Sequence, residues 1–140
     1  MRAFTSVLVL AALAALVGTA VALGSGAKAA HGKRIPVRLK EMSVVPVLKS
    51  SKAGYVTFVV SNAGEVEHEL VVYRRDTSAP LPVKKFKAVE DEAAVVDEVE
   101  DIEPETTRNL SVLLKRGKYL LFCNVPGHHQ LGMSIVFSVT

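Results

Sequence analysis

Apolar and polar residues alternate along most of the chain beyond its first quarter. Ile35, Val37 and Leu39 alternate with basic side chains, and a period of two is typical of a strand with one buried face. Further short runs, rich in β-branched and aromatic residues and separated by turn residues, cover positions 44–48, 55–60, 67–73, 110–114, 118–123 and 133–139. Pro46 in the second run favours an edge strand or a bulge. This spacing predicts an all-β fold for residues 35–140, an antiparallel β-sandwich with Greek-key connections.

Residues 76–105 interrupt this alternation. After a turn-like stretch comes a small basic cluster, formed by Lys84, Lys85 and Lys87. Helical spacing, which favours one or two turns of helix, follows at Val89, Ala93, Val96 and Glu100. Nine carboxylates then fall between positions 90 and 105. We interpret this acidic part either as a solvated loop or as a docking patch for a positively charged partner protein, which would make association salt-sensitive.

The first 29 residues have a different composition. Positions 3–23 are almost wholly apolar, and small residues at alternate positions in 20–22 and 27–29 fit the rule for signal-peptidase cleavage. We interpret residues 1–29 as a signal peptide and residues 30–34 as a linker. The alternative is an uncleaved N-terminal membrane anchor, because the apolar stretch is near the shortest length that spans a bilayer. Either interpretation places the domain outside the cytoplasm, in a periplasm or at the cell exterior.

Charge and cysteine content exclude several classes of protein. The full chain of 140 residues has 17 basic and 14 acidic side chains, and two of the basic ones, Arg2 and Lys28, lie in the expected signal segment. The remaining charge is therefore almost balanced. Its basic residues are scattered and have no accompanying aromatic platform, so nucleic-acid binding is not expected. A single cysteine, Cys123, leaves no internal disulfide, and its thiol is either buried, reactive or metal-bound.

That cysteine lies in a stretch that is dense in soft metal ligands. Residues 123–133 contain Cys123, His128, His129 and Met133. A thiolate, an imidazole and a thioether together favour copper over magnesium, calcium or manganese, and a trigonal blue-copper site takes one Cys, two His and a weak axial Met. The loop supplies three of these four ligands. A second histidine is therefore expected from another part of the chain.

His68 is the candidate for that second histidine. In a strand over 67–73, His68 shares a face with Leu70 and Val72. The same counting places each of the other ligands with apolar neighbours: Cys123 with Leu121 and Tyr119, and Met133 with Ile135, Phe137 and Val139. We therefore expect the ligands to point inward at strand ends. The two other histidines are interpreted as a solvated tail residue, His31, and an exposed loop residue, His129.

These residues resemble the pattern of the cupredoxins, the type 1 (blue) copper proteins of the plastocyanin and azurin superfamily. That pattern is an early His after an Asn-x-Gly turn, followed by Cys, His and Met on one C-terminal loop. The matching residues are Asn62, Gly64, His68, Cys123, His128 and Met133. Four residues separate Cys from His and four separate His from Met, a spacing similar to that of rusticyanin and sulfocyanin. The resemblance covers roughly residues 35–140.

The resemblance implies a function and a set of contacts. It implies one type 1 copper ion held by His68, Cys123, His128 and Met133, and a monomer that carries single electrons between redox partner proteins. It also implies an apolar docking patch beside His128, built here from Val125, Pro126 and Leu131. One residue departs from the pattern, because Glu69 stands where plastocyanin and azurin have Asn after the first histidine.

Other functional classes are weaker on the residues alone. The same ligands would serve an extracytoplasmic copper-storage or delivery protein, so this alternative stays open. A Cys/His hydrolase needs an orienting third group and an oxyanion pocket, and neither is visible in the sequence. A multicopper oxidase or nitrite reductase needs further histidine clusters, whereas the chain has four histidines in all. We therefore do not expect an enzyme.

Overall fold

The computed structural model describes residues 32–75 and 81–140 of the chain. The expected signal or anchor segment 1–29, the first residues of the expected linker, and His31 lie outside these ranges. Regular structure in the described parts consists of strands. None of the described residues belongs to a helix that is long and apolar enough to cross a bilayer.

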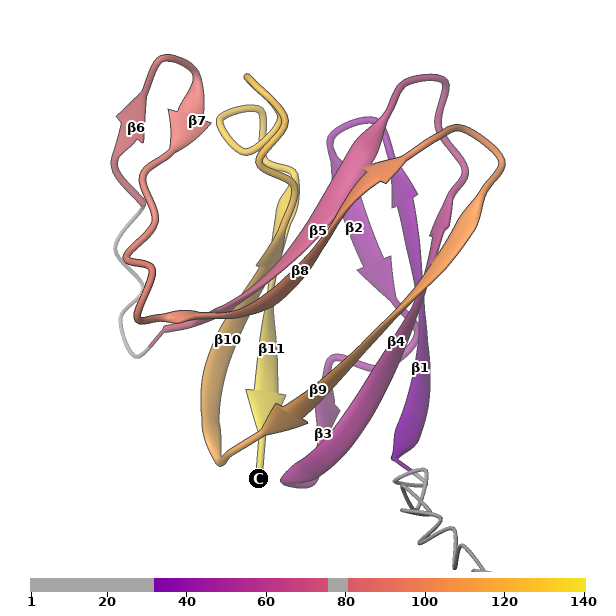
Figure 1. Cartoon of the computed structure of the whole chain (residues 1–140), viewed down its shortest axis with the longest axis vertical. Coiled ribbons are helices and arrows are strands. Elements are labelled where there is room, and N and C mark those ends of the chain that lie inside the picture. The colour runs from indigo at the N-terminus through magenta and orange to yellow at the C-terminus, as the bar shows by residue number, and fades with distance from the viewer. Residues whose placement is uncertain (1–31, 76–80) are drawn as a thin grey trace, which may run out of the picture.

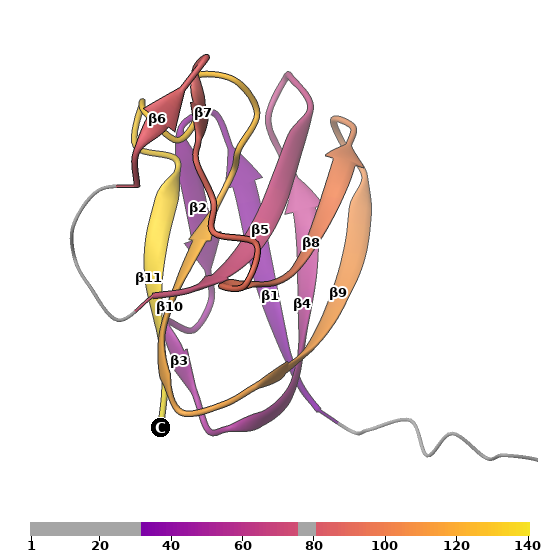
Figure 2. The same cartoon turned by 60° about the vertical axis from the view of Figure 1, so that its left-hand side comes forward.

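Two sheets pack face to face and form a sandwich (Figures 1 and 2). The first sheet contains, in spatial order, β2 (Ser43–Pro46), β1 (Lys33–Lys40), β4 (Gly54–Asn62) and β9 (Thr107–Leu114). The second contains β3 (Ser50–Ser51), β11 (Ser134–Val139), β10 (Gly117–Phe122), β5 (His68–Arg74) and β8 (Val95–Ile102). A separate hairpin consists of β6 (Val83–Lys84) and β7 (Lys87–Ala88). The predicted all-β sandwich is confirmed, and β2 lies at a sheet edge as Pro46 indicated.

The sheets are not purely antiparallel, because β1 pairs with β4 and β3 pairs with β11 in parallel. After the β1–β2 hairpin the chain crosses to the other sheet as β3 and then returns as β4. The chain reverses between β1 and β2 and again before β4, so β4 has the direction of β1 and pairs with it in parallel. All other described strand pairs are antiparallel.

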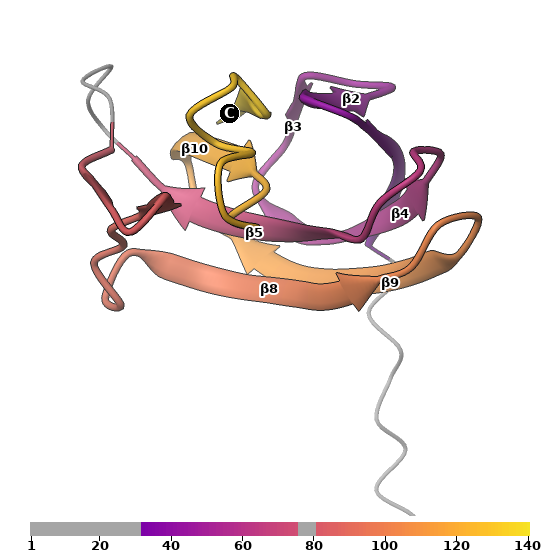
Figure 3. The same cartoon turned by 90° about the horizontal axis from the view of Figure 1, so that it is seen from above.

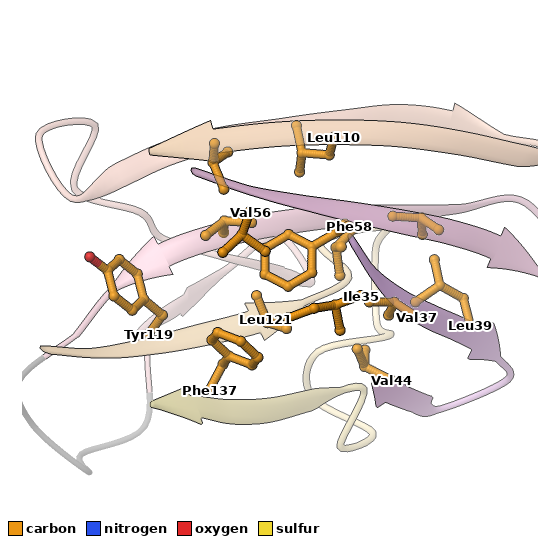
Figure 4. Packing of buried hydrophobic residues seen from close by; sticks show 14 of the residues in the cluster. Ile35, Val37, Leu39, Val44, Val56, Phe58, Leu110, Tyr119, Leu121 and Phe137 are labelled. Atoms are coloured by element: carbon orange, nitrogen blue, oxygen red, sulfur yellow. The ribbon is translucent and has the colours of Figure 1, made fainter. Parts of the chain in front are cut away.

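The core lies between the two sheets and follows the period-two pattern of the sequence. Ile35, Val37 and Leu39 of β1 are buried while their neighbours are exposed. Phe58 and Phe137 meet in this core, with ring centroids 5.4 Å apart and planes at 82°. Figure 4 shows both rings among the apolar side chains that surround them. Such an edge-to-face contact is favoured by the aromatic quadrupoles. The core therefore joins strands of both sheets into one rigid body.

Strand β5 is buried on both faces, which the sequence did not indicate. Its inner face contributes Leu70 and Val72 to the main core. Its outer face belongs to a second apolar cluster, completed by the segment that follows residue 80, and the members are Val71, Tyr73, Leu81, Ala88, Leu120 and Phe122. The chain after β5 thus folds back over the second sheet.

The prediction for residues 76–105 was only partly right. No helix forms among the described residues at 89–100, where a single turn is closed by hydrogen bonds from the N–H groups of Ala94 and Val95 to the Asp91 carbonyl. Much of the acidic part is the regular strand β8 rather than a loop. Strand β8 pairs antiparallel with β5 and forms the edge of the second sheet. Sheet pairing with β5 outweighed the helical spacing, which is a weak local preference. The carboxylates of β8 point mainly into solvent, and charge on an edge strand also discourages pairing with other chains.

Candidate metal centre

The predicted ligands lie at one end of the second sheet because of its strand order. His68 starts β5, Cys123 follows the end of β10, and Met133 precedes β11. Strand β10 is antiparallel to both β5 and β11, so the start of β5, the end of β10 and the start of β11 meet. The loop 123–133 lies with the β6–β7 hairpin at the top of Figure 1, opposite the C terminus, and it is seen from above in Figure 3.

His68, Cys123 and His128 direct one donor atom each toward a common point. The Nδ1 atoms of the two histidines are 3.2 Å apart, and the Cys123 Sγ lies 3.8 Å from His68 Nδ1 and 3.4 Å from His128 Nδ1. All three residues are buried. His68 is far from Cys123 and His128 in the sequence, so the fold is what brings it to them.

The size of this triangle can be compared with the bonds that a metal ion makes. A point equidistant from three atoms separated by 3.2, 3.4 and 3.8 Å lies about 2.0 Å from each atom. Zinc, for comparison, binds imidazole nitrogen at about 2.0 Å and thiolate sulfur at about 2.3 Å. A thiolate with two imidazoles in a trigonal arrangement is a donor set that suits copper. The residues present therefore fit one copper ion.

Met133 is fully buried in the same apolar cluster as Cys123. Its backbone is tied to both neighbouring ligands, because the Met133 N–H donates to the His128 carbonyl at 3.0 Å and the Cys123 N–H donates to the Met133 carbonyl at 3.1 Å. Gly127 has a φ of 88°, a conformation that glycine adopts at little cost. The loop between Cys123 and Met133 is thus closed on itself by main-chain hydrogen bonds.

The thiol of Cys123 is in an environment that favours its neutral form until a metal binds. Burial raises the pKa of Cys123 to about 11, although N–H groups of Glu69 and Val125 oppose the shift. The Glu69 N–H donates to the Cys123 Sγ at 3.5 Å. A main-chain N–H directly after His68 therefore donates to the sulfur. Donors of this kind around a metal-bound sulfur tune the metal.

Both histidines are arranged to stay neutral, which is the form that binds a metal. Burial is the main cause that lowers the pKa of His68, and the nearby His128 lowers it further while Glu41 opposes the shift. Burial also lowers the pKa of His128, again opposed by Glu41. The two rings meet edge to face, with centroids 5.0 Å apart. His128 lies closer to the surface than His68, which is completely enclosed.

Asn62 shapes the loop that delivers His68. Its side chain is buried and donates to the carbonyls of Val66 and Ile102 at 2.8 and 2.7 Å, and it accepts from the Gly64 N–H at 2.8 Å. The side chain therefore uses its donors and its acceptor at the start of the 62–68 loop. The Asn-Ala-Gly turn was expected from the sequence, and the link from Asn62 to strand β8 was not.

Glu69 and Asn124, the residues that follow His68 and Cys123, connect the ligand segments. Burial is the main cause that raises the pKa of Glu69, whereas Lys87 and a hydrogen bond from the Asn124 N–H lower it. The Asn124 side chain accepts from the Ala88 N–H at 2.7 Å and donates to the Ala88 carbonyl at 3.2 Å and to Glu90 at 2.6 Å. Glu69 thus joins the two ligand segments through its carboxylate, at the position where related patterns have Asn.

His129 differs from the expectation of an exposed loop residue. It is partly buried, and its ring packs against Phe122 at a centroid distance of 5.1 Å. Burial, with the nearby charge of Arg75, lowers the pKa of His129. Because Phe122 faces the outer cluster, His129 points away from the donor triangle, as the opposite orientation of adjacent residues predicts.

The surface beside His128 is apolar, as expected for Pro126 and Leu131. Leu131 is 66% exposed and Pro126 is also exposed, whereas Val125 is partly buried. A further exposed apolar residue, Phe86, was not expected from the sequence and is 70% exposed. The Phe86 carbonyl accepts a hydrogen bond from the Gly127 N–H at 2.7 Å, so the turn of the β6–β7 hairpin lies next to the loop that carries His128.

Comparison with solved structures identifies the fold. The chain is similar to auracyanin from the photosynthetic bacterium Roseiflexus castenholzii, with a TM-score of 0.60, 17% identity, and coverage of 78% of this chain and 98% of that one. It is also similar to auracyanin A of Chloroflexus aurantiacus, a "blue" copper protein (TM-score 0.53, 20% identity, 75% and 99% covered). Reduced rusticyanin gives a TM-score of 0.56 at 18% identity, with 78% and 81% covered. The chain has the cupredoxin fold.

The cupredoxin fold is evident here from the structure rather than from sequence comparison. No protein-family model matches the sequence, and no curated protein matches it significantly. The described strands nevertheless form the sandwich, and a buried cluster of one Cys and two His lies at its end. The donor set and the cupredoxin fold agree on one copper ion.

Proposed function

We propose that this chain is an exported type 1 copper protein that carries single electrons between redox partner proteins. In this proposal His68, Cys123, His128 and Met133 would hold the ion through one thiolate, two imidazoles and one thioether. Bound copper supplies one-electron chemistry by alternating between Cu(II) and Cu(I). The observation that carries the proposal is the triangle of one buried sulfur and two imidazole nitrogens, with sides of 3.2 to 3.8 Å.

Each ligand has a distinct part in the proposal. The thiolate of Cys123 would bind the ion covalently, would give the site its colour and would offer a route for the electron. The two imidazoles would complete the donor set, and the Met133 thioether would favour Cu(I) relative to a harder oxygen donor. His68, Cys123 and Met133 are fully buried, so water has little access to the ion. Strand ends and main-chain hydrogen bonds hold the ligands, and little rearrangement then opposes electron transfer.

Electrons would enter and leave through the surface beside His128. Among the proposed ligands the His128 side chain is the nearest to solvent, and exposed apolar side chains lie on its own loop, at Pro126 and Leu131, and on the adjoining hairpin, at Phe86. A small apolar surface of this kind suits a brief encounter with a partner, since weak redox complexes bury less area than stable ones.

We propose that the chain is a monomer and that it has no catalytic activity. We also propose that it works in a periplasm or at the cell exterior, either released or anchored through residues 1–29.

The alternative is a copper-storage or delivery protein with the same ligands. Such a protein needs a metal that exchanges readily, whereas the fully buried His68 and Cys123 favour a closed site with slow exchange. The enclosed geometry therefore supports the electron carrier. The two functions differ in a property that can be measured, namely the rate of redox cycling compared with the rate of metal loss.

The test uses the purified full chain loaded with one equivalent of Cu(II). An electron carrier should give a reversible one-electron wave in voltammetry, and it should retain copper through many cycles in the presence of a competing chelator. A storage or delivery protein should lose its copper to the chelator within the same period. Loss of copper upon reduction, or an irreversible wave, would contradict the electron-carrier proposal.

A further inference from the structure

The buried imidazole of His68 has one nitrogen that the donor triangle does not use. His68 Nδ1 faces Cys123 and His128, while Nε2 is buried and has no hydrogen-bond partner among the described residues. Glu41 Oε1 lies 3.6 Å from this Nε2 atom, an ion-pair distance slightly longer than a direct hydrogen bond. Buried polar groups are nearly always satisfied, so Nε2 and the Glu41 carboxylate form a pair that needs explaining.

The Glu41 carboxylate is held in place by the loop that delivers His68. Glu41 lies in the turn between β1 and β2, and its Oε1 accepts from the N–H of Glu65 and, at 3.3 Å, from the N–H of Val66. Gly64 is the third part of this arrangement, because a Cβ at that position would collide with the Glu41 carboxylate. One carboxylate therefore links the β1–β2 turn, the 62–68 loop and the buried histidine.

The position of the proton on the imidazole ring decides which group donates in this contact. When Nδ1 binds a metal, the neutral ring carries its proton on Nε2. That Nε2–H then points to the side of the ring where Glu41 lies. A carboxylate that accepts from the second nitrogen of a metal-binding histidine fixes the tautomer and the ring orientation, and it raises the basicity of the ligand.

On the basis of the proposed copper function, we propose that Glu41 is a positioning residue for His68 and that it stabilises Cu(II) relative to Cu(I). The negative charge lies next to the imidazole of a ligand, where it favours the more positive oxidation state of the ion. Its accepted hydrogen bond acts in the same direction, because a more basic imidazole is a better donor to Cu(II). Nothing in the sequence connects position 41 with position 68, so the assignment depends on the fold.

Three variants separate the charge of Glu41 from its position. Glu41→Gln keeps a side-chain oxygen for the N–H groups of Glu65 and Val66 and removes only the charge. Gly64→Ala keeps the charge and displaces the carboxylate, which is the flexible end of a side chain. Glu67→Gln is the matched control, since it removes an exposed carboxylate adjacent to His68.

The measurements are the reduction potential of the copper-loaded full chain and the affinity of the metal-free chain for Zn(II), which has no redox chemistry. We expect Zn(II) affinity to fall about tenfold in Glu41→Gln and in Gly64→Ala, because partners of metal-binding histidines typically contribute about 10- to 100-fold. If Cu(II) affinity falls tenfold more than Cu(I) affinity, the potential rises by about 59 mV for a one-electron couple. Glu67→Gln should change both quantities much less.

The measurements distinguish failure of the proposed copper function from failure of the proposed role of Glu41. A wild-type chain without a reversible copper couple overturns the proposed function itself. A normal wild-type couple together with unchanged potential and Zn(II) affinity in Glu41→Gln and Gly64→Ala overturns the role of Glu41 alone. A shift in Glu67→Gln as large as that in Glu41→Gln also overturns it, because the effect would then be a general response to charge. Glu41→Gln preserves the hydrogen bonds of the loop, so the test remains interpretable if Gly64→Ala fails to fold.

Discussion

In the metal-free chain, the thiol of Cys123 is buried in surroundings that disfavour its charged thiolate form. Cys123 is enclosed by apolar side chains and by two neutral imidazoles, and burial raises its pKa to about 11 from an ordinary value of 9.0. The folded metal-free chain therefore holds the thiol proton more firmly than the unfolded chain does. A metal that binds as the thiolate complex must displace this proton, which couples metal binding to pH.

The first prediction concerns the stability of the metal-free protein at high pH. A raised pKa means that stabilisation by the neutral thiol is fully present below about pH 9 and is lost as pH rises through about 11. The size of this loss is about 2 to 3 kcal/mol. Urea unfolding under reducing conditions, at about pH 8 and about pH 11, should show a larger loss for the wild type than for Cys123→Ser. Equal losses in both proteins would contradict the burial of the thiol.

The second prediction separates the two adjacent histidines. His128→Ala removes a donor of the triangle and opens the site to solvent, so Cu(II) affinity should fall by at least about 100-fold, the upper end of the cost of losing even an outer partner. Electron exchange with a redox partner should slow severely. His129→Ala, in which the removed ring packs on Phe122, should keep both properties near the wild-type values. Competition with a chelator measures the affinity, and similar losses in the two variants would contradict the assignment.

At the scale of elements, the ligand loop depends on the β6–β7 hairpin that lies beside it. Asn124 binds Ala88 through both ends of its amide, and the Phe86 carbonyl accepts from the Gly127 N–H. The hairpin also carries Ala88 into the outer apolar cluster on β5. It thus covers the outer face of the strand that begins with His68.

The third prediction tests this connection. Asn124→Ala removes three buried or partly buried hydrogen bonds and leaves groups of Ala88 without partners, so the free energy of unfolding should fall by about 2 to 3 kcal/mol. Asn109→Ala is the control, since Asn109 is exposed on β9 and its loss should cost about 0.5 kcal/mol or less. Urea unfolding of both variants checks the difference. Comparable values would show that Asn124 does not hold the hairpin.

The elements also show where sequence patterns are sufficient and where they are not. Alternation placed β1, β4 and β9 correctly because each has one buried face with period two. It also located β5 and β10, although it did not indicate that consecutive residues of both strands are buried. The same parity indicated that His68 and Cys123 face the same core. Alternation failed to predict β8, because the pattern of Val and carboxylate residues there also fits helical spacing. Pairing with β5 decides its structure instead. Glu41 was missed because a lone carboxylate in a turn carries no periodic signal, and only folding brings it to His68.

At the scale of the whole molecule, charges of opposite sign lie near the metal centre. The exposed lysines of the β6–β7 hairpin accompany Phe86 on one side. On the other side, the acidic strand β8 ends at Ile102, which pairs with His68. Of the two interpretations of the acidic part, the docking patch for a positively charged redox protein stays a prediction, and its carboxylates now belong to the exposed strand β8.

The fourth prediction tests that patch by charge removal. Glu98→Gln together with Glu100→Gln should lower the association rate with a cationic redox protein by up to about tenfold at low salt, because steering by opposite charge increases on-rates. The wild-type rate should fall as salt is added, and the two proteins should converge at high salt. Stopped-flow electron transfer measures both rates. A wild-type rate that does not change with ionic strength would reject the docking patch.

The central claim is that one sulfur and two imidazoles at the end of the sandwich hold a single copper ion. Its most direct test is a titration of the purified, reduced full chain with Cu(II), followed by visible absorption, with Cys123→Ser as the control. We predict an intense visible band that saturates at one equivalent of copper and is absent from Cys123→Ser. No band in the wild type, saturation only beyond one equivalent, or an unchanged band in Cys123→Ser would contradict the account.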